Sequence, residues 1–143
     1  MGIQEDSKRF DQIFLKMDRG YERYAKSWGM NYSSLALFQL IWEKQPCTQK
    51  YICDITMLPK QTVNSIVMSF VKQGYVEMVE LPDDRRHKAI SLSAAGNDFA
   101  NRILPKIKAA EDQSIIQFSQ EERRQFFNLL EKFSAAFLQE LSK

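Results

Sequence analysis

The chain has 143 residues, of which 44% are hydrophobic and 27% charged, and its formal net charge is +2 with a pI of about 8.5. These values are normal for one globular domain with a real core, and they are less basic than the usual footprint of an autonomous DNA binder. Charge alone therefore does not predict a nucleic-acid partner.

Two further absences bound the class of protein. No run approaches the roughly 18 apolar residues of a membrane span. The first residues also lack the apolar core of a secretory signal. We therefore expect a cytoplasmic protein without a membrane partner, and the lack of a basic nuclear-type signal fits a bacterial source.

The first two predicted helices are rich in apolar residues. One runs from about Ile3 to Trp28, and the other from about Tyr32 to Glu43. The first has an aromatic stripe along one side, made by Phe10, Phe14, Met17, Tyr21, Tyr24 and Trp28. The second is apolar over much of its circumference, which is typical of a buried helix.

The next segment has the layout of a helix-turn-helix. Thr48 is placed to cap a short helix whose Ile52 and Ile55 are expected to face inward. Pro59 suits the first turn of a second helix, predicted over Lys60–Lys72. Two helices and a tight turn within about 25 residues are the arrangement of this DNA-binding motif.

The second of these helices has two contrasting faces. Its apolar stripe consists of Val63, Ile66, Val67, Phe70 and Val71. The opposite face and its flanks carry Gln61, Asn64, Ser65, Met68, Ser69 and Lys72. Short amides and hydroxyls with a lysine suit base edges and phosphates, although an ordinary solvated polar face is the alternative.

A short hairpin is predicted after this helix. Gly74 is a plausible C-cap, and Tyr75–Val79 and Lys88–Leu92 are predicted strands. Between them, Leu81–His87 is predicted to form a charged hairpin tip. A helix-turn-helix followed by a two-stranded hairpin with a basic tip is a winged helix.

Two helices are predicted to complete the chain. A long helix opens near Ser93 and contains Pro105, which is expected to kink it. Ser119–Glu122 forms a capping box for the last helix. That helix has an apolar stripe of Phe126, Leu130, Phe133 and Phe137. The first and last helices could pack on each other within one chain, but we favour a dimer interface shared by both.

The sequence contains no catalytic or metal-binding pattern. The single histidine, His87, completes no triad, the five glycines are not clustered, and the spacing of Cys47 and Cys53 matches no common zinc site. We therefore expect no enzyme activity, cofactor or metal. Cys53 is interpreted as a small buried residue. Cys47 precedes a helix start, whose positive end could lower the thiol pKa, so redox sensing at Cys47 stays open as an alternative.

Three segments together resemble one family of regulators. Thr48–Val76 matches its helix-turn-helix without a gap, and Pro82–Arg86 matches its wing signature of an aspartate followed by two arginines. Ile90–Gly96 stands where members carry a Leu-Thr-x-x-Gly run. On these segments the chain resembles the MarR (multiple antibiotic resistance regulator) family of bacterial winged-helix transcription factors, over essentially its whole length.

The resemblance and the predicted elements imply one fold. We expect a mainly α protein with a small β-hairpin, in the order α-α-α-α-β-β-α-α. Residues 1–143 would form a single MarR-like domain, with a winged helix-turn-helix core at about 32–92. The helices at about 3–28 and 94–142 would serve dimerisation, as they do in family members.

The predicted function is sequence-specific DNA binding by a homodimeric transcriptional repressor on a palindromic operator. The resemblance implies release by a small, often aromatic, effector bound between the dimer helices and the winged helix-turn-helix core. The alternative is a winged helix used for protein–protein contact, with weak DNA binding. The residues expected to contact DNA are Gln49, Lys50, Lys60, Gln61, Thr62, Asn64, Ser65, Met68, Lys72, Arg85, Arg86, His87 and Lys88.

These residues have distinct expected roles. Gln49 and Lys50 would bind phosphate, whereas Gln61, Asn64 and Ser65 would lie near base edges. One of the two wing arginines would reach the minor groove, and Asp84 would pair with the other and stiffen the wing. Three positions depart from the family pattern: Met57 replaces a turn glycine, Pro59 a capping serine, and Ser65 an arginine.

Overall fold

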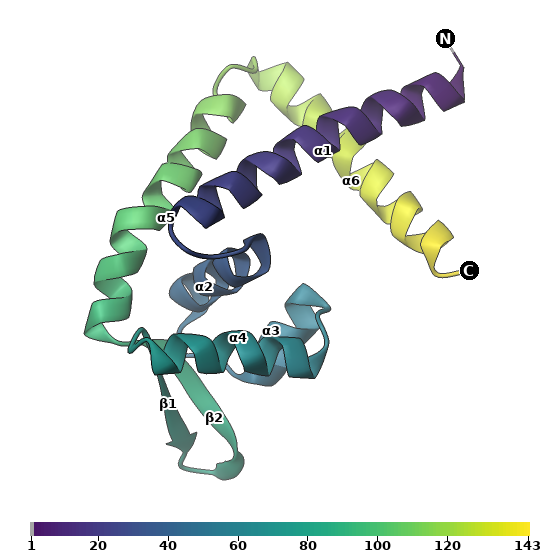
Figure 1. Ribbon diagram of the computed structural model, residues 1–143. Helices are drawn as coiled ribbons and strands as arrows, with labels where there is room; N and C mark the ends of the chain where they lie inside the picture. The colour runs from purple at the N-terminus through teal and green to yellow at the C-terminus, as the bar shows by residue number, and fades with distance from the viewer. Residues whose placement is uncertain (1) are drawn as a thin grey trace. The chain divides into compact units, whose positions relative to one another are not determined.

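The computed structural model describes residues 2–143 apart from the side chain of Arg85, and in this part of the chain it has six helices and one antiparallel pair of strands (Figure 1). The element order confirms the predicted fold class. The elements are α1 (Ile3–Ser27), α2 (Tyr32–Lys44), α3 (Gln49–Thr56), α4 (Lys60–Lys72), β1 (Val76–Leu81), β2 (Asp84–Leu92), α5 (Ala94–Ile115) and α6 (Gln120–Leu141).

Two compact units follow one another along the chain. The first unit is Met1–Ile103 and contains α1 to α4, the hairpin and the start of α5. The second unit is Leu104–Lys143 and contains the rest of α5 and α6. Over the described residues, no helix combines the length and the apolar character needed to cross a membrane.

An aromatic cluster lies at the centre of the first unit. Phe38 of α2 is fully buried, and its ring centroid lies 5.0 Å from that of Phe70 and 5.7 Å from that of Phe99. Tyr75 stacks on Phe99 with centroids 4.7 Å apart. These contacts join α2, α4 and α5 to the start of the hairpin. They confirm that α2 is buried and that the apolar stripe of α4 faces inward.

The helix-turn-helix forms as predicted, with one exception. The hydroxyl oxygen of Thr48 accepts a hydrogen bond from the backbone N–H of Tyr51 at 3.1 Å, which caps α3. Ile52 is fully buried, but Ile55 is 56% exposed, so its predicted inward position is wrong. The buried side of α3 instead follows Ile52 to Thr56, four residues further on, and Ile55 lies off that side.

The turn of the motif has an unusual backbone at Met57. Its φ is +58° and its ψ is +17°, which lie in the left-handed region. The resemblance to the MarR family places glycine at this position in many relatives. A residue with a Cβ adopts this conformation only at some energetic cost. The Met57 N–H donates to the carbonyl of Cys53 at 2.8 Å, which closes the last turn of α3. Met57 therefore takes the place of a C-cap glycine.

The hairpin is longer than predicted, and its tip is shorter. The strands extend to Leu81 and from Asp84, so the tip is only Pro82 and Asp83, not Leu81–His87. Both faces of the hairpin end are open to solvent, and charged side chains there do not prevent backbone pairing.

The pairing of the two strands is shifted near the tip. Glu80 pairs with Lys88, but the next β1 residue, Leu81, pairs with Asp84. All six residues of β1 are thus paired with other residues of β2. Residues 85–87 have no partner in β1 and are an insertion in β2. We call residues 85–87 the wing bulge.

The wing is attached to the helix-turn-helix by the segment before α3. Cys47 and Ile90 exchange two backbone hydrogen bonds, at 3.1 and 2.7 Å. The Gln45 side chain accepts from the backbone N–H of Leu92 at 2.9 Å and donates to the Asn97 side chain at 3.1 Å. This segment thus fixes β2 beside α3.

The second unit contains the predicted capping box. The Ser119 hydroxyl accepts from the backbone N–H of Glu122 at 3.1 Å, and the Glu122 carboxylate accepts from the backbone N–H of Ser119 at 3.0 Å. No residue of α6 is buried. The apolar side chains exposed along α6 are Phe126, Phe127, Leu129, Leu130, Phe133, Phe137, Leu138 and Leu141.

Candidate nucleic-acid interface

Helix α4 presents one continuous polar face to solvent. The opposite face is fixed in the core by Val63, Val67 and Phe70, which are buried. The predicted contact residues on α4 are all exposed: Lys60, Gln61, Thr62, Asn64, Ser65, Met68 and Lys72. Because none of them is used for packing in the core, this face is available to a ligand along the whole helix.

The first turn of α4 begins at an exposed proline. Pro59 is the N-cap residue, and no side chain caps the helix there. The Gln49 side chain of α3 lies against this turn, since its amide donates to the carbonyl of Lys60 at 3.4 Å, a long hydrogen bond. Gln49 is partly buried. It therefore links the two helices of the motif.

Lys50 has a partner that the sequence reading missed. Its Nζ lies 2.8 Å from the Asp54 carboxylate, and both side chains are exposed. The hydrogen bond with Asp54 raises the pKa of Lys50 above its ordinary value. The spacing of four residues on one helix is the signal that would have found this pair. Asp54 competes directly with any phosphate that approaches Lys50.

The Asp84 carboxylate closes the wing bulge. One oxygen accepts from the backbone N–H of Arg86 at 2.9 Å, and the other lies 2.5 Å from Nδ1 of His87. The described contacts of Asp84 are thus with the Arg86 backbone and the His87 ring, and its expected pairing with an arginine guanidinium stays a prediction, because the Arg85 side chain lies outside the described part of the structure. An aspartate two residues before a backbone N–H forms a compact turn with it, which directs the second oxygen to His87.

These contacts change the acidity of Asp84. The hydrogen bond with His87, and then that with the Arg86 N–H, hold the pKa of Asp84 below its ordinary value. The carboxylate form is thus favoured by the folded wing. This contribution is present above the ordinary pKa of an aspartate and is lost as the pH falls through the lowered value.

The remaining wing residues lie along β2. Arg86, His87 and Lys88 are exposed, and Lys88 lies across the hairpin from Glu80. The side chain of Arg85 lies outside the described part of the structure, so its expected role stays a prediction. The wing thus presents basic residues beside acidic ones, in keeping with the small net charge of the chain.

Cys47 is a buried residue whose backbone pairs with that of Ile90. It is buried beside β2, and this burial raises the pKa of its thiol. The alternative left open for Cys47 supposed that the start of α3 lowers this pKa, whereas burial raises it. A neutral, buried thiol is a poor nucleophile, because the thiolate is the reactive form.

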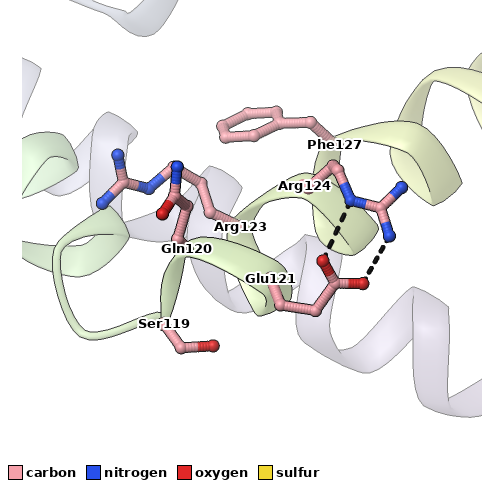
Figure 2. Close-up of a pocket in the computed structure, with 6 residues that line it drawn as sticks. All are labelled: Ser119, Gln120, Glu121, Arg123, Arg124 and Phe127. Atoms are coloured by element: carbon pink, nitrogen blue, oxygen red, sulfur yellow. Dashed lines mark hydrogen bonds and ion pairs between the residues drawn. The ribbon is translucent and has the colours of Figure 1, made fainter.

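No group of three or more metal-ligating side chains is found among the described residues. A hollow at the start of α6 is lined by Ser119, Gln120, Glu121, Arg123, Arg124 and Phe127 (Figure 2). Figure 2 shows Arg124 turned toward Glu121, and this ion pair lowers the pKa of Glu121. Arg124 is therefore neutralised by its own helix, and the hollow lies outside the helix-turn-helix and wing.

Known proteins resemble this chain over the helix-turn-helix and the wing. Residues 28–87, from the end of α1 to the wing, match the model of the MarR family. The chain is also 27% identical over 112 residues to the HTH-type transcriptional regulator SarZ of Staphylococcus haemolyticus. The matched region covers 77% of this chain and 74% of that protein.

Solved structures share the whole fold. FabT of Streptococcus pneumoniae in complex with DNA has a TM-score of 0.78 at 20% identity, over 98% of this chain and 99% of that one. The S. aureus MepR–DNA complex has a TM-score of 0.78 at 18% identity, over 91% and 96%. NMB1585 of Neisseria meningitidis, a MarR family regulator, has a TM-score of 0.74 at 24% identity, over 99% and 98%.

Proposed function

We propose that this chain is a member of the MarR family, a family of transcriptional regulators and not of enzymes whose model residues 28–87 match, and that it acts as a homodimeric repressor of a palindromic operator. The observation that carries the proposal is the exposed face of α4, where amide and hydroxyl side chains are held out because Val63, Val67 and Phe70 of the opposite stripe are buried. Helix α4 would enter the major groove, and the wing would contact the adjacent backbone and minor groove.

A dimer accounts for the apolar surface at both ends of the chain. All of α6 is exposed, and α1 exposes Ile13, Phe14, Leu15 and Met17. Large apolar surfaces of this kind are usually covered by a partner. A second copy would cover them by two-fold symmetry and would place two α4 helices about 34 Å apart, one turn of DNA.

A small-molecule effector would complete the regulation. We propose that it binds between the dimer helices and the winged helix-turn-helix core and alters the separation of the two α4 helices. The support is the match of residues 28–87 to the MarR family model. Such a ligand releases DNA only through its different affinity for the two arrangements.

Selection of bound sequences from random DNA tests this function. We expect a palindromic consensus with half-sites about 10 base pairs apart, because a two-fold dimer reads the same sequence twice. Bound sequences without two-fold symmetry would contradict the homodimeric operator, and a lack of any enrichment would contradict sequence-specific binding.

Changes on the α4 face should separate base reading from phosphate contact. Gln61→Ala or Asn64→Ala is expected to weaken operator binding by about 1–3 kcal/mol, with little change on random DNA. Fluorescence anisotropy on both duplexes measures the difference. Gln73→Ala, at the far end of the helix, is the matched control and should leave both affinities unchanged. Equal losses on both duplexes for the first two variants would show that these side chains only position the protein.

The Lys50–Asp54 pair predicts a gain of binding. Asp54→Asn should free Lys50 for phosphate, raise affinity for operator and random DNA by about two- to fivefold, and steepen the salt dependence by about one unit. The control is Asp112→Asn, which breaks the similarly exposed Lys108–Asp112 pair of α5. If Asp54→Asn gives the same gain in a Lys50→Ala background, Lys50 is not the residue released.

A further inference from the structure

The wing bulge raises the question of which group holds it in shape. Residues 85–87 have no partners in the β1 register, so the regular cross-strand pairs that fix a strand are interrupted at them. In their place, the Asp84 carboxylate binds the Arg86 N–H at 2.9 Å and the His87 ring at 2.5 Å. These two contacts span the bulge from its first flanking residue to its last member.

We propose that His87 is a positioning residue for DNA binding: its ring, held by Asp84, closes the wing bulge and sets how Arg86 is presented. This inference rests on the proposed function, because it assigns how the wing is prepared for DNA. It differs from the role expected for His87 as a direct contact. It also differs from a brace between Asp84 and the Arg86 guanidinium, because Asp84 binds the backbone N–H of Arg86 and leaves the charge of its side chain for phosphate.

Charge argues against His87 as a phosphate contact. Nδ1 of its ring is turned to a carboxylate, and both side chains are about half exposed at the hairpin end. A phosphate that approaches the ring also approaches Asp84, whose negative charge repels it. The pair therefore offers phosphate no net positive charge. Its contribution is to keep the Arg86 backbone in one conformation, so that the arginine loses less freedom on binding.

A double-mutant cycle on the full-length protein tests this assignment. His87→Ala and Asp84→Ala should each weaken binding to the selected operator by about two- to fivefold, the range of an exposed pair. The double variant should bind the operator as tightly as the single variant with the lower affinity, because both substitutions break the same contact. An equal loss from His87→Ala in the parent and in the Asp84→Ala background would overturn the proposal and make His87 an independent contact.

Salt dependence and a conservative change give two further readouts. His87→Ala should leave the slope of log affinity against log salt unchanged, whereas Arg86→Ala should reduce it by about 1, because only the arginine contacts phosphate. His87→Asn keeps a donor on the same side-chain carbon as Nδ1 and should restore most of the affinity. A reduced slope for His87→Ala, or no rescue by asparagine, would contradict a positioning role.

Titration of the Asp84 carboxyl by NMR in the free protein separates the two levels of the proposal. In His87→Ala the pKa of Asp84 should rise toward its ordinary value, because its first partner is gone. An unchanged titration would overturn the contact itself, even if the protein binds DNA. A parent protein that binds no DNA would instead overturn the proposed function and this role with it, whatever the titration shows.

Discussion

Replacement of Gly96 by alanine is expected to destabilise the protein by about 3 kcal/mol. A Cβ built on Gly96 would lie 2.0 Å from the carbonyl oxygen and 2.9 Å from the carbonyl carbon of Tyr75. These are backbone atoms, and the same carbonyl accepts a hydrogen bond from the N–H of Ser93 at 3.0 Å. The carbonyl therefore cannot move aside without breaking the junction between β1 and α5.

The side chain of Ser93 strengthens this junction. Its hydroxyl donates to the carbonyl of Gly74 at 2.5 Å and accepts from the Gly96 N–H at 3.0 Å. Helix propensity alone predicts the opposite sign, because alanine stabilises a helix by about 0.5–1 kcal/mol relative to glycine. The clash should dominate, and chemical denaturation monitored by circular dichroism measures the difference.

A matched substitution shows whether the loss is specific to this contact. Gly20→Ala places the same methyl group within α1, where nothing lies within 4 Å of it. That variant should be as stable as the parent or slightly more stable. A Gly96→Ala protein with unchanged stability would contradict the close approach of α5 to the end of α4 and the start of β1.

Introduction of a charge on α6 is expected to abolish the dimer. Leu130 is 45% exposed in the single chain, so Leu130→Glu should be tolerated by one protomer but would bury an unpaired charge in the proposed interface. Loss of the second half-site contact should lower operator affinity by about 10²–10⁴-fold. Sedimentation should show a dimeric parent and a monomeric or unfolded variant.

The control for this change lies on the same helix. Asn128→Glu adds the same side chain two positions earlier, on the side of α6 away from the apolar stripe. It should remain dimeric and bind the operator as the parent does. A dimeric Leu130→Glu protein with normal operator affinity, or a monomeric parent, would show that α6 does not form the interface.

Local patterns predicted the elements whose signals lie within a few residues. Helix α4 has a proline before its first residue and a long apolar stripe, so its bounds were correctly predicted. Gly74, with a φ of +81°, follows it as the predicted C-cap glycine. The capping box of α6 was equally clear. In each case the residues that define the element are its own neighbours in sequence.

The predictions were wrong or incomplete where a helix is short or where a contact joins residues far apart in the sequence. Helix α3 has only eight residues, too few for periodicity to distinguish Ile52 from Ile55. Burial of Cys47 comes from its pairing with Ile90, far along the chain, so its position next to a helix start gave the wrong direction for its pKa. The contact between Asp84 and His87 was missed because it depends on the wing bulge, which spacing alone does not reveal.

Salt dependence of binding to the selected operator and to random DNA of equal length tests the central claim most directly. A DNA-binding α4 face and wing predict that both affinities fall steeply as salt rises, by about 0.9 in slope for each phosphate contact, and that the operator stays the tighter ligand throughout. The alternative, a winged helix used for protein–protein contact, predicts little binding to either duplex at any salt. Weak binding of that kind at low salt, with no preference for the operator, would contradict the function proposed for this protein.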